Sequence, residues 1–191
     1  METASQTAGP FLHIGLMPRL AGIEGVYAEE LGRSPVAPGA KGTPITVTGT
    51  IFDGAGAPVL DAMIESWQAD AAGHYPGAAG ADPMVTGFCR FASDAETGQF
   101  TLKTIKPGPT AGREGQGFAP HIALWIVARG INRALQTRIY FADEPWEGDP
   151  ILTRIAPTGR VQSLMAEPVG EGAYRFDIRL QGADETVFFD L

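Results

Sequence analysis

Cysteine is nearly absent from this chain of 191 residues, which has Cys89 alone. A single cysteine excludes an intrachain disulfide and a metal site built from several thiolates. We interpret Cys89 as a small buried hydrophobe, and a chain without disulfides fits a reducing compartment. No stretch of 18 apolar residues could span a membrane, and the segment 1–10 lacks the basic and apolar parts of a secretory signal. These features together predict a cytoplasmic protein.

Positive charge is also scarce. The chain has 14 Lys and Arg against 22 Asp and Glu, which gives a formal net charge of −8. Nucleic acids and anionic membranes attract proteins with a basic excess, so neither partner is expected here. A local basic pocket remains compatible with this composition. Hydrophobic residues make up 44% of the chain, which is enough to build the core of one globular domain.

Histidine is limited to His13, His74 and His121, and the usual catalytic motifs are missing. The sequence has no HExxH or CxxC motif, and none of its serines lies in a nucleophile elbow. The glycine-rich stretch 112–117 does not open a helix after a strand, so a phosphate site there is not supported. These residue types alone predict a soluble β protein and leave its function open.

Glycine and proline are plentiful, with 25 and 15 residues, and many of them separate short apolar runs. Alternating or continuous apolar runs predict strands at 44–52, 58–67, 97–105, 121–128, 135–141, 174–180 and 187–191. One short helix is predicted at 150–155, because Asp149 is a good N-cap and Pro150 occupies the first helical position.

The order of these elements predicts an all-β fold. We expect a β-sandwich of about eight mainly antiparallel strands with long loops at 70–88 and 108–120. Residues 1–42 show no secure helix and are interpreted as an N-terminal arm that contacts a partner subunit. Residues 43–191 are expected to form the sandwich domain.

Several phrases, read in order, resemble the intradiol ring-cleavage dioxygenases and, within that family, the alpha chains of protocatechuate 3,4-dioxygenases. They are SQTAGPF at 5–11, ESWQADAAGHY at 65–75, TIKPGP at 104–109, APHIA at 119–123, ARGIN at 128–132, TRIYF at 137–141 and YRFDIR at 174–179. Each phrase alone is a weak signal. Their common order along nearly the whole chain makes the resemblance specific.

The resemblance implies an altered metal site. Catalytic members hold Fe³⁺ with two tyrosinates and two histidines, a set of hard oxygen and imidazole ligands that suits a ferric ion. Tyr75 matches the first tyrosine and His121 the first histidine. The second tyrosine is replaced by Thr110 and the second histidine by Ala123. The resemblance therefore implies that this chain binds no metal and that Fe³⁺ belongs to a homologous beta subunit.

The resemblance also implies a shared active site. In the family, alpha and beta chains alternate, and protocatechuate and O₂ react at their boundary to give 3-carboxy-cis,cis-muconate. By resemblance, Thr7, Gly9, Pro10 and Arg129 line the substrate pocket of the beta partner, where a guanidinium suits the substrate carboxylate. The chain is expected to be inactive alone, as one subunit of an intradiol dioxygenase in aromatic catabolism.

Two other hypotheses stay open at this point. The chain could be a free-standing carbohydrate- or protein-binding sandwich of the same fold, since fold alone does not decide function. The retained arm at 7–10 argues against it. The chain could also be an active dioxygenase that uses His74 as a ligand. Adjacent side chains of an extended segment point to opposite sides, so His74 and Tyr75 are not expected to reach one metal ion.

Overall fold

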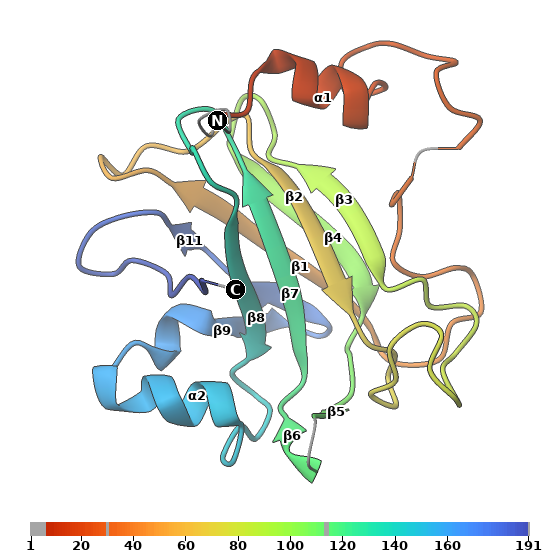
Figure 1. Ribbon diagram of the computed structural model, residues 1–191, viewed down its shortest axis with the longest axis vertical. Helices are drawn as coiled ribbons and strands as arrows, with labels where there is room; N and C mark the ends of the chain where they lie inside the picture. Colours follow the sequence, from red (N-terminus) through yellow and green to blue (C-terminus); the bar gives the residue numbers. More distant parts are fainter. Residues whose placement is uncertain (1–6, 30, 113–114, 191) are drawn as a thin grey trace, which may run out of the picture.

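The strands form two layers around one core (Figure 1). The computed structural model describes residues 7–29, 31–112 and 115–190, apart from the side chain of Pro10. The first layer contains, in spatial order, β8 (Leu135–Phe141), β7 (His121–Val127), β2 (Met63–Gln68) and β3 (Phe88–Ala92). The second contains β4 (Gln99–Ile105), β1 (Pro44–Phe52), β10 (Ala173–Arg175) and β11 (Ile178–Arg179).

Strand β9 (Met165–Gly170) connects the layers, because it pairs with β8 at one end and with β10 at the other. Most neighbours are antiparallel, while β1 runs parallel to β10 and β11, and β8 runs parallel to β9. The all-β prediction of two layers is therefore confirmed.

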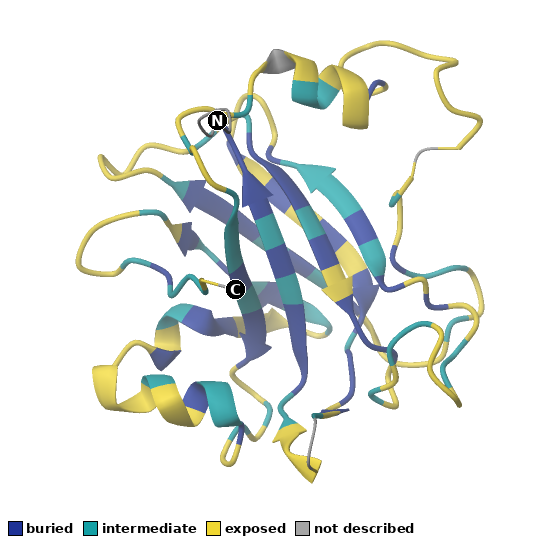
Figure 2. Ribbon diagram, viewed as in Figure 1, coloured by how far each residue is buried: buried dark blue, intermediate teal, exposed yellow. Residues whose placement is uncertain are grey.

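The core lies between the layers and is built by residues at alternate positions. Val47 and Ile51 of β1 point inward from one layer, and Ile122 and Ile126 of β7 do so from the other. Figure 2 shows the alternation as dark and paler bands along the same strands. Period-two alternation places one set of side chains in the core and leaves the other set on the outer face. The outer face of the first layer is where the candidate site lies.

The run predicted as one strand at 174–180 is divided into β10 and β11. At the break, the Asp177 carboxylate accepts a hydrogen bond from the backbone N–H of Thr50 at 2.9 Å. The N–H of Phe176 donates to the Thr48 carbonyl oxygen at 2.8 Å. A side chain therefore replaces one backbone partner of β1, which interrupts the ladder without leaving the donor unsatisfied.

Several short strands were not predicted. They are β3, β9, β5 (Thr110–Ala111) and β6 (Gly117–Phe118). Strand β9 contains Pro168 and ends in a glycine, residues that normally argue against a strand interior. It forms because its first two residues pair with β8 and its later residues pair with β10, where the register shifts between Ala173 and Tyr174. The predicted strand at 187–191 was wrong for its described part, because residues 187–190 form no strand.

The helix α2 (Pro150–Ile155) confirms its prediction, and the Asp149 carboxylate accepts hydrogen bonds from two backbone N–H groups of its first turn. The expectation of no helix in the arm was wrong, since α1 (Pro10–Leu16) forms there. A proline at its first position supplies the helical φ, although no side chain caps it. Among the helices of the described chain, none is long and apolar enough to cross a membrane.

The arm contacts the sandwich along β3 and the preceding loop. Val36 forms an isolated bridge with Val85, and the Gly32 carbonyl oxygen accepts a hydrogen bond from the Arg90 N–H. The Arg90 guanidinium also donates to the Leu16 carbonyl oxygen at 3.4 Å. Much of the arm is nevertheless exposed (Figure 2). The boundary between an arm at 1–42 and a domain at 43–191 stays a prediction.

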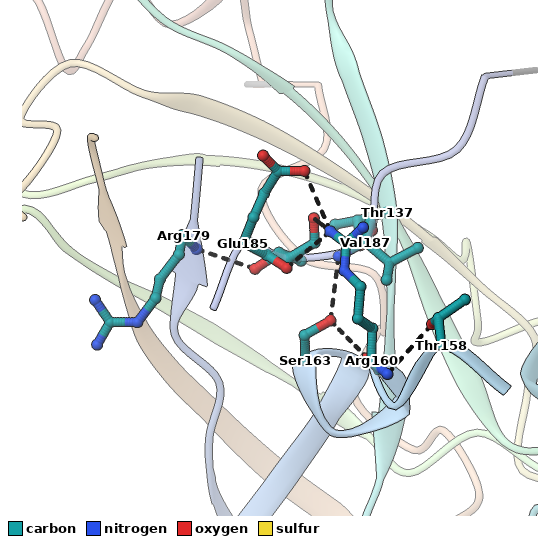
Figure 3. A network of polar contacts seen from close by, with 8 residues as sticks. Thr137, Thr158, Arg160, Ser163, Arg179, Glu185 and Val187 are labelled. Carbon is teal, nitrogen blue, oxygen red and sulfur yellow. Dashed lines mark hydrogen bonds and ion pairs between the residues drawn. The ribbon is translucent and has the colours of Figure 1, made fainter. Parts of the chain in front are cut away.

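The last segment is held against the sandwich by a polar network (Figure 3). The Thr137 hydroxyl of β8 donates to the Val187 carbonyl oxygen at 2.8 Å. Arg160 donates to the carboxylate of Glu185 at 3.2 Å and to its carbonyl oxygen at 3.0 Å. The Ser163 hydroxyl accepts from the Val187 N–H at 3.2 Å. These contacts satisfy backbone groups in a segment that lacks a ladder of its own.

Candidate functional site

Four side chains form a block on the outer face of β7 and β8. In the strand register, His121 lies opposite Tyr140, and Ala123 lies opposite Arg138. Residues two apart on a strand share a face, and directly paired residues of neighbouring strands share it too. The pairing of β7 with β8 therefore brings His121, which matches the first histidine ligand, and Ala123, which replaces the second, together with Arg138 and Tyr140.

Tyr75 reaches this block from the loop between β2 and β3. The buried Asp70 carboxylate organises the loop by accepting hydrogen bonds from the backbone N–H groups of Ala72, His74 and Asp82, at 2.8–2.9 Å. Burial would raise the pKa of Asp70, but these N–H donors outweigh it and hold the pKa below its usual value. The Tyr75 ring then stacks on Trp67, with centroids 6.1 Å apart.

The Tyr75 hydroxyl and the His121 ring are hydrogen-bonded to each other. The Tyr75 oxygen lies 3.2 Å from His121 Nε2, and His121 Nδ1 lies 2.8 Å from the Ala119 carbonyl oxygen. A carbonyl oxygen only accepts, so Nδ1 carries the hydrogen and Nε2 is the acceptor. The Tyr75 hydroxyl therefore donates to Nε2. The Tyr75 oxygen and His121 Nε2, which are the two atoms that would ligate a metal, are thus already hydrogen-bonded to each other.

Burial keeps both groups neutral. Burial lowers the pKa of His121 to about 4, and the positive charge of Arg138 acts in the same direction. Burial also raises the pKa of Tyr75, although Arg138 and a hydrogen bond from Thr110 oppose that shift. At neutral pH the pair is thus a neutral phenol bonded to a neutral imidazole.

The residues at the four ligand positions do not fit a ferric ion. The structure places Thr110, Tyr75 and His121 close together, and Ala123 two residues along the same strand face. A neutral threonine hydroxyl and a methyl group replace a phenolate and an imidazole, so half of the ligand set is missing. Nowhere in the described residues do three or more His, Cys, Asp or Glu side chains gather as they would around a metal.

Arg138 completes the surroundings of the pair. Its guanidinium donates to the Tyr140 hydroxyl oxygen at 3.3 Å and lies over the Phe118 ring, 5.5 Å from the centroid. Burial raises the pKa of Tyr140 to about 12, with Arg138 opposing the shift. The His121 and Tyr140 rings are 5.6 Å apart. The block is thus an aromatic cluster with one fixed positive charge.

The two other expected features lie elsewhere. The His74 ring is 3.8 Å from the Asp70 carboxylate and about half exposed, while its neighbour Tyr75 faces His121. This arrangement agrees with the expectation that His74 and Tyr75 face different sides. Cys89 is buried, and burial raises the pKa of its thiol to about 11, as expected of a small hydrophobe.

The second group of expected residues gathers at the opposite end of β7. The Thr7 hydroxyl accepts a hydrogen bond from the Gly130 N–H at 2.7 Å and donates to the Ala128 carbonyl oxygen at 3.3 Å. These two contacts span Arg129, which lies between the bonded residues. Gly9 is the N-cap of α1. Pro10 begins that helix, and its side chain lies outside the described parts.

A hollow of about 560 Å³ opens between α1 and this turn. Gly9, His13 and Arg129 lie around it, with apolar side chains from the segment after α1. The Arg129 side chain is 80% exposed and pairs with Asp61, whose carboxylate oxygen is 3.3 Å from its Nε. Arg129 also borders a second hollow of about 570 Å³ on the other side of the turn.

The structure brings Thr7, Gly9 and Arg129 together and separates them from the Tyr75–His121 pair. Arg129 follows His121 by eight positions of largely extended chain, which corresponds to roughly 25 Å. The chain therefore has two regions of interest at opposite ends of one strand.

Residues missed by the sequence reasoning are Arg138, Tyr140 and Asp61. The alternation of β8 places Arg138 and Tyr140 on one face, which the sequence does indicate. Their pairing with Ala123 and His121 depends on the strand register, which no motif reveals. Asp61 lies far from Arg129 in the chain, so only the fold joins them.

The chain is similar to known dioxygenases in both sequence and fold. Residues 25–182 match the family model described as dioxygenase. The chain is 43% identical to the protocatechuate 3,4-dioxygenase alpha chain of Pseudomonas putida, over 99% of this chain and 96% of that one. It is 34% identical to a protocatechuate 3,4-dioxygenase beta chain of Burkholderia cepacia, over 76% and 67% of the two chains. A solved dioxygenase domain from a Streptomyces dioxygenase–carbohydrate-binding fusion superposes with a TM-score of 0.56 and 29% identity, over 84% of this chain and 96% of that one.

Proposed function

Since this chain belongs to the intradiol ring-cleavage dioxygenase family, we propose that it is the metal-free alpha subunit of a protocatechuate 3,4-dioxygenase. Its partner is a homologous beta subunit that holds Fe³⁺ and cleaves protocatechuate with O₂. The bound ferric ion supplies the charge that activates the catechol ring. The present chain contributes structure and part of the pocket wall.

One observation carries this proposal. The side chains at the four ligand positions are a phenol and an imidazole bonded to each other at 3.2 Å, a buried threonine and an alanine. Losing even a group that only supports a ligand typically costs 10–100-fold in metal affinity. Loss of two direct ligands removes the site altogether. A chain that keeps the family fold without these ligands fits a role beside an iron-bearing partner.

The arm and the β7–β8 turn support the pocket role. Thr7 fixes the turn by bonding on both sides of Arg129, so an exposed guanidinium projects from a rigid base. A carboxylate approaching it exchanges with Asp61, which holds the guanidinium through a single ion pair at 3.3 Å. Gly9 leaves its side of the hollow open, because a glycine places no side chain there. These features fit recognition of the protocatechuate carboxylate at the subunit boundary.

The exposed apolar surface of the arm supports a partner subunit. Large apolar side chains there are exposed by 36–83%; they are Phe11, Ile14, Leu16, Leu20, Ile23, Val26, Tyr27 and Leu31. A stable monomer rarely leaves so many large apolar side chains of one segment in water, whereas obligate interfaces are rich in them. We propose that the beta subunit covers this surface. We also propose a cytoplasmic location, which the lone buried thiol of Cys89 fits.

Co-expression with a homologous beta chain that has all four ligands tests the function. We expect a complex that holds one ferric ion per pair of chains, shows a visible tyrosinate band and consumes O₂ with protocatechuate. The chain expressed alone should show none of these activities. If the two chains failed to associate, or the beta chain were equally active alone, a free-standing binding module would be the better explanation.

A further inference from the structure

The Tyr75–His121 pair shares its surroundings with one permanent cation, Arg138. Ala123 lies directly across from Arg138 in the register, where opposite Cβ atoms are about 4.5–5.5 Å apart. Because alanine is small, it leaves room on the sheet face beside it. The guanidinium contacts Tyr140 and Phe118 on the same face.

This charge lies beside the pair. Two rings that Arg138 contacts are also neighbours of His121: the ring centroid of Tyr140 is 5.6 Å from that of His121, and the ring centroid of Phe118 is 6.2 Å from it. Its contact with the Tyr140 hydroxyl and its position over the Phe118 ring anchor it from two sides. Arginine stays protonated at any ordinary pH, so the charge cannot be withdrawn.

A second cation would meet two obstacles here. It would have to approach a fixed positive charge in a partly buried setting, where water screens repulsion poorly. To be ligated by the Tyr75 oxygen or by His121 Nε2, it would also have to break the hydrogen bond between these two atoms. A histidine introduced at position 123 would in addition compete with Arg138 for the same part of the sheet face.

We propose that Arg138 is the resident cation of this cluster and that its charge excludes metal ions even when both missing ligands are supplied. This inference rests on the proposed function, in which the wild-type chain binds no iron. It goes further by assigning the exclusion to one residue outside the four ligand positions. In this proposal the guanidinium of Arg138 already supplies the positive charge of the cluster, and it repels a metal cation.

The test uses the full-length chain and ferric iron alone as the probe. The variant Thr110→Tyr/Ala123→His restores both ligands and keeps Arg138. Two further variants add Arg138→Gln, which removes the charge, or Arg138→Lys, which keeps it. Bound iron is measured by metal analysis and by the visible tyrosinate band, after thermal unfolding has verified that each variant folds.

We expect stoichiometric iron only in the variant that includes Arg138→Gln, with at least tenfold tighter binding than in the variants that keep arginine or have lysine at this position. Equal iron binding by the ligand-restored variant with and without Arg138→Gln would overturn the inference while leaving the proposed function intact. Iron binding by the wild-type chain would overturn the proposed function as well.

A milder variant keeps the inference testable if the restored ligands prevent folding. In Arg138→Ala, the cluster has lost the guanidinium together with its hydrogen bond to Tyr140 and its contact with Phe118. Millimolar methylguanidinium should then raise the thermal midpoint of this variant and leave that of the wild-type chain unchanged. The same shift in both proteins, or no shift in either, would show that the cluster does not require a cation.

Discussion

The Thr7 hydroxyl accepts a hydrogen bond from the Gly130 N–H at 2.7 Å, although the two residues are 123 positions apart in the chain. This contact joins the start of the described arm to the turn that carries Arg129. The Thr7 hydroxyl also donates to the Ala128 carbonyl oxygen, so the arm holds the turn on both sides of Arg129.

Arg129→Ala in the assembled complex should lower kcat/KM for protocatechuate about 10–100-fold. A charge-assisted hydrogen bond to a carboxylate contributes about 1.5–3 kcal/mol, and about 1.4 kcal/mol corresponds to tenfold. Steady-state kinetics on protocatechuate and on plain catechol is the measurement. Catechol has no carboxylate, so it should lose less, and the iron content should not change.

The matched control is Asp61→Asn, which removes the negative charge that pairs with Arg129 and keeps the size of the side chain at position 61. Freed from Asp61, the guanidinium should still meet the carboxylate, so kcat/KM should stay within a few fold of wild type. Equal losses on both substrates in Arg129→Ala would mean that the residue supports assembly or loop order instead.

The chain expressed without a partner should self-associate at micromolar concentration. Phe11 and Leu31 are 83% and 71% exposed, and water-exposed apolar surface of this extent drives association. Replacing both by serine should increase the fraction of monomer in sedimentation velocity without lowering the thermal midpoint, because neither side chain belongs to the core. A monodisperse wild-type monomer would contradict the proposed interface.

The Asp143 carboxylate should make stability depend on pH. It accepts hydrogen bonds from Lys106 Nζ at 3.0 Å and from the Tyr174 hydroxyl at 2.8 Å. Burial would raise the pKa of Asp143, but these contacts hold it below its usual value. A lowered pKa in the folded state stabilises the protein above the unfolded pKa of about 3.9. That contribution is lost as the pH falls through the folded value.

The measurement compares thermal midpoints of the wild-type chain and Asp143→Asn between pH 7 and pH 2.5. The variant should be less stable at pH 7, and the difference should shrink as the pH falls below about 4. A difference that stays constant over this range would mean that the carboxylate acts through packing and not through its charge.

Gly49→Ala should destabilise the sandwich severely. An added methyl group would collide with the Phe176 carbonyl oxygen and the Phe100 ring, so backbone would have to move. Overpacking of this kind typically costs about 1–3 kcal/mol or more. Gly170→Ala is the control, because the nearest atom to its added methyl group is 3.8 Å away. Denaturant unfolding of both variants distinguishes a steric cost from a general cost of replacing glycine.

Local sequence patterns determined much of the fold. The alternation in β1, β4 and β8, and the continuous apolar run of β7, were sufficient to predict those strands. The cap at Asp149 was sufficient for α2. Family phrases also indicated the four ligand positions and the two replacements among them, because the ligands are identified by residue type.

Only the tertiary structure decided what depends on register and long-range contact. Strand β9 exists because two layers each accept one of its ends, although its own residues disfavour a strand. Arg138 lies beside Ala123 because β7 and β8 pair in one register, and a shift by one residue would turn it to the core. The sequence determines which groups are available, and the pairing of distant segments determines which of them meet.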